Sequence, residues 1–186
     1  MSVIRIAHRY AKSLLEFAHE ENALDAVYAD AQSFMKVLEN KEFRRMLKSP
    51  IIKADKKEAI YDAIFGGKFH KITDGFFKII MRKHRENLLE EIVKEFIVEY
   101  KAFNHISVVK LITATPISEE TIEAIKAQLL ASDKTDEKIE LTTKVDPELM
   151  GGFVLEFNNQ LYDASLAHKL DKLKREFNQN LYIKNF

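Results

Sequence analysis

In roughly the first 105 residues, the apolar positions recur every three or four residues, which is the period of an amphipathic α-helix. Two regular stripes run over residues 24–38 and 88–100. Proline and glycine interrupt this half at only a few positions, Pro50, Gly66, Gly67 and Gly75. Since Ser49-Pro50 and the glycine pair are suited to ending helices, the pattern predicts an all-α domain of about six helices.

After His105 the apolar period changes to two, which is typical of β-strands. Alternating residues predict strands over 108–113, 139–145 and 153–157, and a short fourth strand at Leu161-Tyr162. A helix is expected from Ser118 to Leu130, because Ser118 suits an N-cap and acidic residues follow it. Another is expected from Ser165 to about Asn178. The predicted fold class is α+β, with an N-terminal six-helix bundle over residues 1–105 and a small C-terminal α+β domain over 106–186.

Two of the predicted helices carry more apolar surface than burial in one bundle requires. The apolar arc of the first helix spans about 180°, whereas burial needs little over about 100°. Its members include Ile6, Tyr10 and Phe17. In the segment 69–84, a core stripe is predicted from Ile72, Phe76 and Ile79, with the apolar surface extended around the side by Phe77, Ile80 and Met81. Either these are central helices wrapped by neighbours, or they border a groove for a partner's amphipathic helix.

Composition places the chain among folded proteins and excludes several functions. Of its 186 residues, 46% are hydrophobic and 31% are charged, and the 29 basic residues equal the 29 acidic ones. A neutral chain has no overall field to attract nucleic acid or an anionic membrane. The absence of cysteine excludes disulfides, thiolate metal sites and thiol nucleophiles. No apolar run approaches the roughly 20 residues that span a bilayer.

The first 15 residues contain Arg5, Arg9 and Lys12 without an acid, which resembles a transit peptide. The helical pattern continues through Glu16 without a small-residue cleavage zone, so this stretch is interpreted as the first helix of the fold.

The residues that could carry chemistry have simpler structural interpretations. None of the six histidines has another at the spacing that places two metal ligands on one helical face. Gly66-Gly67-Lys68 lacks the Ser or Thr of a phosphate-binding loop and is interpreted as a helix terminus. Ser165 has no glycine-flanked elbow, so we interpret it and Asp163 as helix-capping residues. The sequence predicts no catalytic residue, no metal site and no cofactor.

Two motifs together resemble the delta subunit of F-type ATP synthases, called the oligomycin-sensitivity-conferring protein in mitochondria. The first is Arg9-Tyr10-Ala11-Lys12-Ser13-Leu14, similar to the family's opening helix. The second is similar to its C-terminal signature: Met150-Gly151-Gly152-Phe153-Val154-Leu155, followed by Leu161-Tyr162-Asp163-Ala164-Ser165-Leu166. The resemblance covers essentially the whole chain. Among the departures, His84 precedes Arg85 where a Gly-Arg pair is frequent.

The resemblance implies a non-catalytic stator subunit of a proton-translocating ATP synthase, on the cytoplasmic face of a bacterial plasma membrane. Implied partners are the N-terminal helices of the alpha subunits and the C-terminal end of the b subunit, with membrane association only through the complex. The family binds the alpha helix between its first and fifth helices, which implies contacts at Ile6, Tyr10, Phe17, Phe77, Ile80 and Met81. The last helix is the candidate for the stalk contact, although core packing explains the same apolar stripe. An unrelated helical adaptor remains the alternative function.

Overall fold

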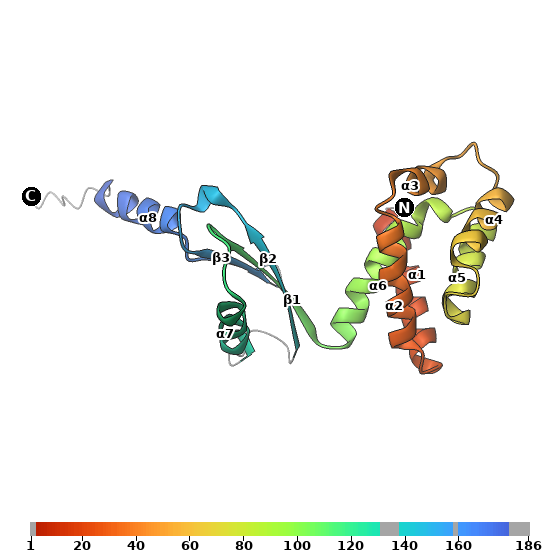
Figure 1. The fold of residues 1–186 in the computed structure, drawn as a ribbon, viewed down its shortest axis with the longest axis horizontal. Coiled ribbons are helices and arrows are strands. Elements are labelled where there is room, and N and C mark those ends of the chain that lie inside the picture. Colours follow the sequence, from red (N-terminus) through yellow and green to blue (C-terminus); the bar gives the residue numbers. More distant parts are fainter. Residues whose placement is uncertain (1–2, 131–137, 158–159, 179–186) are drawn as a thin grey trace, which may run out of the picture. The chain divides into compact units, whose positions relative to one another are not determined.

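The computed structural model of the protein describes residues 3–130, 138–157 and 160–178 (Figure 1). The chain divides into two compact units between Asn104 and His105. The fold class is α+β, since helices dominate the first unit and the second contains a small mixed sheet.

The first unit is helical. Its helices are α1 (Val3–Glu20), α2 (Leu24–Val37), α3 (Lys41–Lys48), α4 (Ala54–Phe65), α5 (Lys71–Arg82) and α6 (Leu89–Phe103), with a short 3₁₀ turn η1 (Glu86–Leu88) before α6. Helix α6 packs along α1, where Ala7, Ala11 and Ala18 are completely buried. These small side chains let the two helices approach closely. Helix α6 contributes Ile92 and Phe96 to the same core.

The helix ends follow the expected chemistry. Helix α4 ends at Phe65, where Gly66 and Gly67 follow, and Gly67 adopts a left-handed φ of 74°. The prediction that this glycine pair ends a helix is therefore confirmed. Asn40 caps α3, because its side-chain oxygen accepts hydrogen bonds from the backbone N–H groups of Glu42 and Phe43.

The second unit contains a four-stranded sheet in the order β2-β1-β3-β4. Its strands are β1 (Ile106–Thr113), β2 (Lys138–Val145), β3 (Phe153–Phe157) and β4 (Gln160–Asp163), and its helices are α7 (Glu119–Leu130) and α8 (Leu166–Asn178). Strands β1 and β2 are parallel, and the other pairs are antiparallel. The four predicted strands and both predicted helices are present. Because side chains alternate across a sheet, Val109, Leu111, Leu155 and Phe157 share one face and form the core with Ile125 and Leu129 of α7.

A close backbone contact joins the start of β3 to the start of α8. A Cβ atom on Gly152 would lie 2.5 Å from the Ala164 carbonyl oxygen, and Gly152 has a φ of 80°. The Leu166 N–H donates to the Gly151 carbonyl over 3.0 Å. Ser165 caps α8 by accepting from the His168 N–H, and Asp163 accepts from the Ser165 N–H over 2.8 Å. The predicted capping roles of Asp163 and Ser165 are confirmed.

Candidate partner-binding groove

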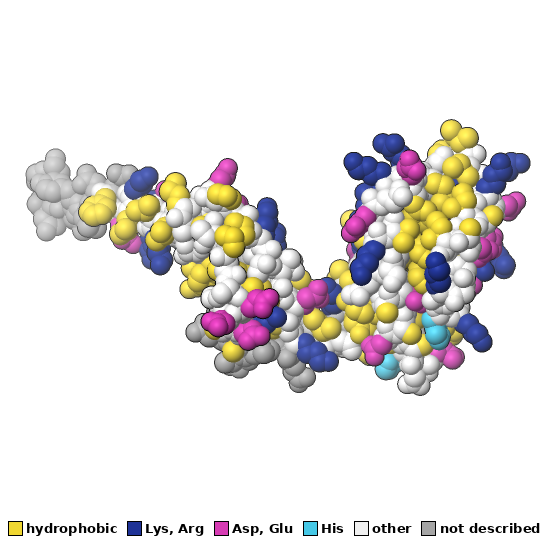
Figure 2. Space-filling model, in the orientation of Figure 1, with side chains coloured by type: hydrophobic (Ala, Val, Ile, Leu, Met, Phe, Trp, Pro, Cys, Tyr) yellow, Lys and Arg dark blue, Asp and Glu magenta, His cyan; other side chains and the backbone are white. Residues whose placement is uncertain are grey.

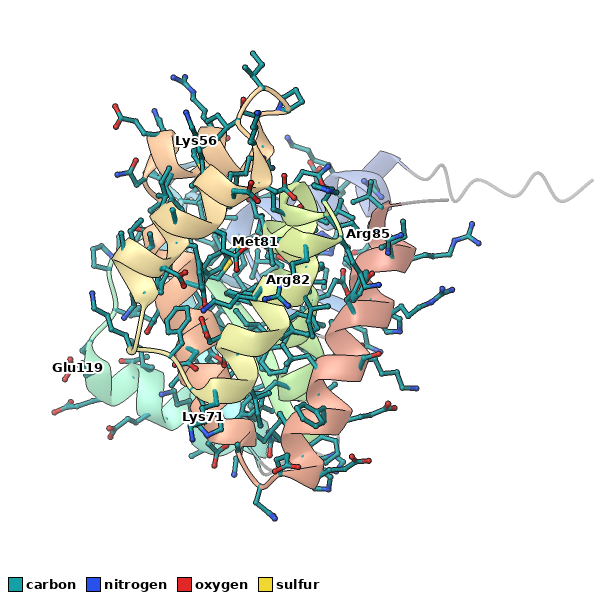
Figure 3. All side chains as sticks on the ribbon, turned by 90° about the vertical axis from the view of Figure 1, so that its right-hand side faces the viewer. Lys56, Lys71, Met81, Arg82, Arg85 and Glu119 are labelled. Carbon is teal, nitrogen blue, oxygen red and sulfur yellow. The ribbon has the colours of Figure 1, made fainter. Side chains whose placement is uncertain are left out.

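Helices α1 and α5 lie side by side and present a mainly apolar flank (Figure 3). The rings of Tyr10 on α1 and Phe76 on α5 meet edge to face, with centroids 6.3 Å apart. Phe17 on α1 and Ile79 on α5 are each 50% exposed. Hydrophobic atoms also gather on the visible face of this unit in the space-filling view (Figure 2).

A shallow hollow of about 330 Å³ lies in this flank. Its lining residues are Phe17, Lys71, Ile72, Gly75, Phe76 and Ile79. A Cβ atom on Gly75 would meet nothing within 4 Å, so this position leaves the hollow open. We call the apolar surface formed by Phe17, Ile72, Gly75, Phe76 and Ile79 the α1–α5 groove. Its apolar character suits the apolar face of an amphipathic helix.

The two apolar stripes of α5 have the opposite roles to those predicted. Phe77, Ile80 and Met81 are 1%, 0% and 1% exposed, so they lie in the core and cannot touch a partner on the surface. The Phe77 ring packs against Phe34 with centroids 4.8 Å apart. The predicted core stripe of α5, Ile72, Phe76 and Ile79, instead lines the groove. The assignment of faces on this helix was therefore wrong.

The three candidate residues on α1 differ in exposure. Phe17 lines the hollow, whereas Ile6 and Tyr10 are half-buried, lie nearer the N-terminus of α1 and do not line it. The Tyr10 hydroxyl accepts a hydrogen bond from Arg85, whose guanidinium carbon lies 5.7 Å from the centroid of the Tyr10 ring. This contact joins α1 to the turn after α5 and fixes the position of the Tyr10 ring.

The N-terminus of α5 is held by a side chain from α2. The Oδ2 atom of Asp30 accepts from the His70 backbone N–H over 2.8 Å and from the Thr73 hydroxyl over 2.7 Å. Thr73 is fully buried, so its bond to Asp30 satisfies a hydroxyl that water does not reach. Sequence reasoning did not identify Asp30, Arg85 or Gly75 as residues that shape this flank. For Gly75 a signal was present, since a lone glycine inside a helical pattern often marks a packing or functional need.

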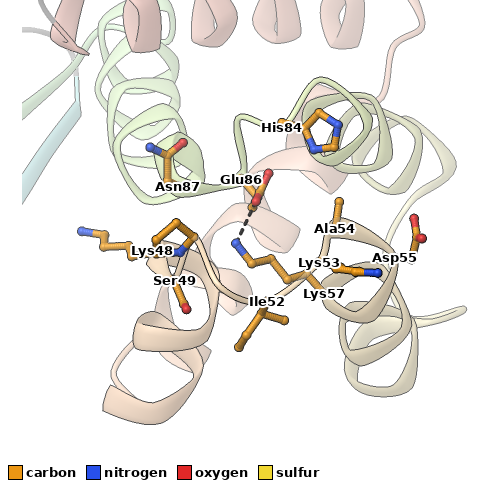
Figure 4. A pocket seen from close by; sticks show the side chains of 11 residues that line it. Lys48, Ser49, Ile52, Lys53, Ala54, Asp55, Lys57, His84, Glu86 and Asn87 are labelled. Atoms are coloured by element: carbon orange, nitrogen blue, oxygen red, sulfur yellow. Dashed lines mark hydrogen bonds and ion pairs between the residues drawn. The ribbon is translucent and has the colours of Figure 1, made fainter.

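A second hollow of about 510 Å³ lies between α3, α4 and η1 and is polar (Figure 4). The Lys57 side chain, one of its lining residues, is 2% exposed, and its ammonium donates to the Leu47 carbonyl over 2.9 Å and to Glu86 over 2.7 Å. A buried charge needs such partners, and here they tie α4 to the end of α3 and to η1. This hollow therefore has a structural explanation.

In the second unit, α8 exposes its apolar stripe. Leu166, Leu170, Leu173 and Phe177 are 48%, 52%, 48% and 86% exposed. Core packing was the competing interpretation of this stripe, but side chains this exposed contribute little to the core of the unit. The stripe forms an apolar surface along one side of α8.

Within residues 3–130, 138–157 and 160–178, no group of three or more His, Cys, Asp or Glu side chains could hold a metal ion. Across the same residues, none of the helices has the length and apolar character needed to span a bilayer.

Comparison with known proteins identifies chains of similar sequence and fold. A family model described as the ATP synthase delta (OSCP) subunit matches residues 6–177. The ATP synthase subunit delta of Cytophaga hutchinsonii is 38% identical over 182 residues, which cover 97% of this chain and 98% of the relative. That of Amoebophilus asiaticus is 37% identical and covers 95% of this chain and 96% of the relative. A chain in the cryo-EM structure of the Toxoplasma gondii mitochondrial ATP synthase hexamer has a similar fold, with a TM-score of 0.74 at 22% identity, covering 92% of this chain and 96% of that chain.

Proposed function

The chain belongs to the ATP synthase delta (OSCP) subunit family, and we propose that it binds an N-terminal helix of the alpha subunits in the α1–α5 groove. It is a non-catalytic subunit of the stator of the enzyme. Family membership over nearly the whole chain sets aside the alternative of an unrelated helical adaptor. Its place would be peripheral, on the cytoplasmic face of a bacterial plasma membrane, held there by the rest of the complex.

The observation that carries the groove assignment is an unfilled apolar surface on a well-packed support. The α1–α5 groove has a hollow of about 330 Å³, while the opposite side of α5 is anchored in the core by Phe77, Ile80 and Met81. A stator must resist torque, which favours an apolar seam on a rigid surface. We propose that α1 to α6 act as one six-helix bundle that keeps this surface in shape.

Of the six residues implied by the family resemblance, Ile6, Tyr10 and Phe17 remain candidates for direct contact. Phe77, Ile80 and Met81 would act from beneath, by holding α5 in position. On the α5 side of the groove, the candidates for direct contact are instead the residues that line the hollow, Ile72, Phe76 and Ile79.

The test is calorimetric binding of a synthetic peptide of the alpha subunit's N-terminal residues to the full chain. A Phe17→Asp, Ile79→Asp double variant places charges at two half-exposed positions, so the fold should survive. We expect it to bind at least about 30-fold more weakly, as for the loss of a central apolar anchor. Val98→Asp is the matched control, since Val98 is 60% exposed on α6 and does not line the groove.

Unchanged affinity of the double variant would indicate that the alpha-subunit peptide binds another surface of the protein. No binding by the unaltered protein would contradict the proposal itself.

We also propose that the apolar stripe of α8 contacts the C-terminal end of the b subunit. The support is its exposure, since four large apolar side chains lie open along one side of the helix. Leu170→Asp with Leu173→Asp should abolish capture of a peptide that carries the C-terminal residues of b. Arg175→Asp, on the opposite side of α8, should not. Equal capture by both variants would rule out this surface.

A further inference from the structure

Two cations stand at opposite ends of α5 on the outer edge of the α1–α5 groove. Lys71 begins the helix and Arg82 ends it, as their labels in Figure 3 show. Eleven residues of an α-helix correspond to about three turns and about 16 Å, and bring the two side chains to within about 20° of the same side. Between them, the groove side of α5 carries Ile72, Gly75 and Ile79. Lys78 lies on the same side as the two cations, but its charge is compensated by Asp62 and Asp74.

Neither cation forms an ion pair within the part of the chain that the structure describes. No carboxylate in that part pairs with Lys71 or Arg82, whereas Lys78 on the same helix is paired with Asp62 and Asp74. A cation in the first turn of a helix is also unfavourable, because it faces the positive end of the helix dipole. The position of Lys71 therefore does not serve the stability of α5.

The exposed side of α1 differs from the edge formed by α5. It carries both signs of charge, with Arg9, Lys12, Glu16 and Glu20 all exposed. A helix bound in the groove would thus meet mixed charge along α1, whereas on α5 the two cations without an ion pair, Lys71 and Arg82, stand beside the compensated Lys78. This asymmetry distinguishes one flank of the bound helix from the other.

We propose that the occupant of the groove is an amphipathic helix with two carboxylates on the flank facing α5, about three turns apart, paired with Lys71 and Arg82. This inference rests on the proposed function, and specifies the chemistry of the partner helix. The apolar seam alone would allow a helix to shift by a turn or to bind reversed, since aliphatic side chains recur along it. Two charge pairs at fixed separation select one register.

The charge pairs are exposed, so each contributes modestly to affinity. Solvent-exposed pairs change binding by about two- to fivefold each, and salt screens them. Removal of both cations should lower the binding affinity by about tenfold, and this loss should depend on salt. The remaining affinity comes from the apolar contact and should depend little on salt.

The experiment uses the full chain and the alpha-subunit N-terminal peptide, with affinity measured at about 50 mM and about 500 mM salt. Lys71→Gln with Arg82→Gln should weaken binding about tenfold at low salt and approach the wild-type value at high salt. Lys56→Gln is the matched control, because Lys56 is an exposed cation on α4 away from the groove (Figure 3). Its affinity should stay within about twofold of wild type.

A second arm replaces the acidic residues of the peptide by glutamine, singly and in pairs. The loss caused by the peptide change should be smaller in the Lys71→Gln, Arg82→Gln protein than in the wild type, as direct pairing requires. Equal binding by the double variant and the wild type at low salt would overturn the inference and leave the groove assignment intact. If the wild type does not bind the peptide at either salt concentration, the proposed function fails instead.

Discussion

At the scale of single residues, His84 holds a backbone conformation that favours glycine. Its φ is 54°, in the left-handed region that strains side chains with a Cβ atom. It follows the C-terminus of α5, where the His84 N–H donates to Met81 and the Arg85 N–H donates to Ile80. This pair of bonds is the Schellman arrangement that glycine most often completes. The departure noted in the sequence, His84 before Arg85, thus falls where the backbone favours glycine.

His84→Gly should raise the free energy of unfolding by about 0.5–1 kcal/mol, since relief of strain outweighs the added freedom of the unfolded chain. Urea unfolding followed by circular dichroism would measure it. The matched control is His19→Gly, because His19 has the same side chain in the right-handed helix α1. That substitution should lower stability by about 1 kcal/mol. A loss of stability in both variants would contradict the assignment of strain to His84.

At the scale of secondary-structure elements, most of the fold could be predicted from the sequence. Three features were visible in the sequence: the change of apolar period near His105, the glycine pair after α4 and the capping residues of α8. Each is determined by residues close together in the chain. Which side of α5 is buried could not be predicted in this way. Its two apolar stripes are adjacent, and either could be buried. Packing of Phe77 against Phe34 and Tyr61, which come from other helices, decides which one is.

A buried carboxylate, that of Glu90, ties α3 to α6. Glu90 is 5% exposed and pairs with Arg44, Lys48 and Lys94 at 2.9, 2.8 and 2.6 Å. Hydrogen bonds from Lys48 and Lys94 lower the pKa of Glu90 from 4.5 to about 2. Because the folded pKa is depressed, this stabilisation is present above pH 4.5 and is lost as the pH falls toward 2.

Glu90→Gln should therefore lower the free energy of unfolding by about 1–2 kcal/mol at neutral pH, allowing for the partial exposure of the three cations. The difference from wild type should shrink between pH 4.5 and about 2, and denaturant titrations across that range would measure it. Glu39→Gln, at an exposed position after α2, should show no such trend. A Glu90→Gln effect that is independent of pH would mean that the cluster does not act through charge.

At the scale of the whole molecule, the first unit has a core of its own. Its buried residues come from all six helices, and an aromatic cluster joins α2, α3, α4 and α5 through Phe34, Phe43, Phe65 and Phe77. The second unit has a smaller buried cluster, centred on Val109, Leu111, Leu155 and Phe157. A unit with its own core can fold independently.

Residues 1–104 should accordingly fold alone, unfold cooperatively, and bind the alpha-subunit peptide within about twofold of the full chain. Calorimetry and amide-resolved NMR would measure this. A fragment with helical content but without a cooperative transition would show that the second unit is needed for its packing.

The contact of Gly152 with Ala164 and Ser165 also constrains how the chain can evolve. Two short segments, one at the start of β3 and the other before α8, meet so closely that a side chain at position 152 would collide with backbone. Any side chain at position 152 is therefore penalised, and because the atoms it would meet belong to the backbone, no change of side chain at Ala164 or Ser165 relieves the clash. Position 152 should therefore stay glycine while the sequence between the two segments diverges.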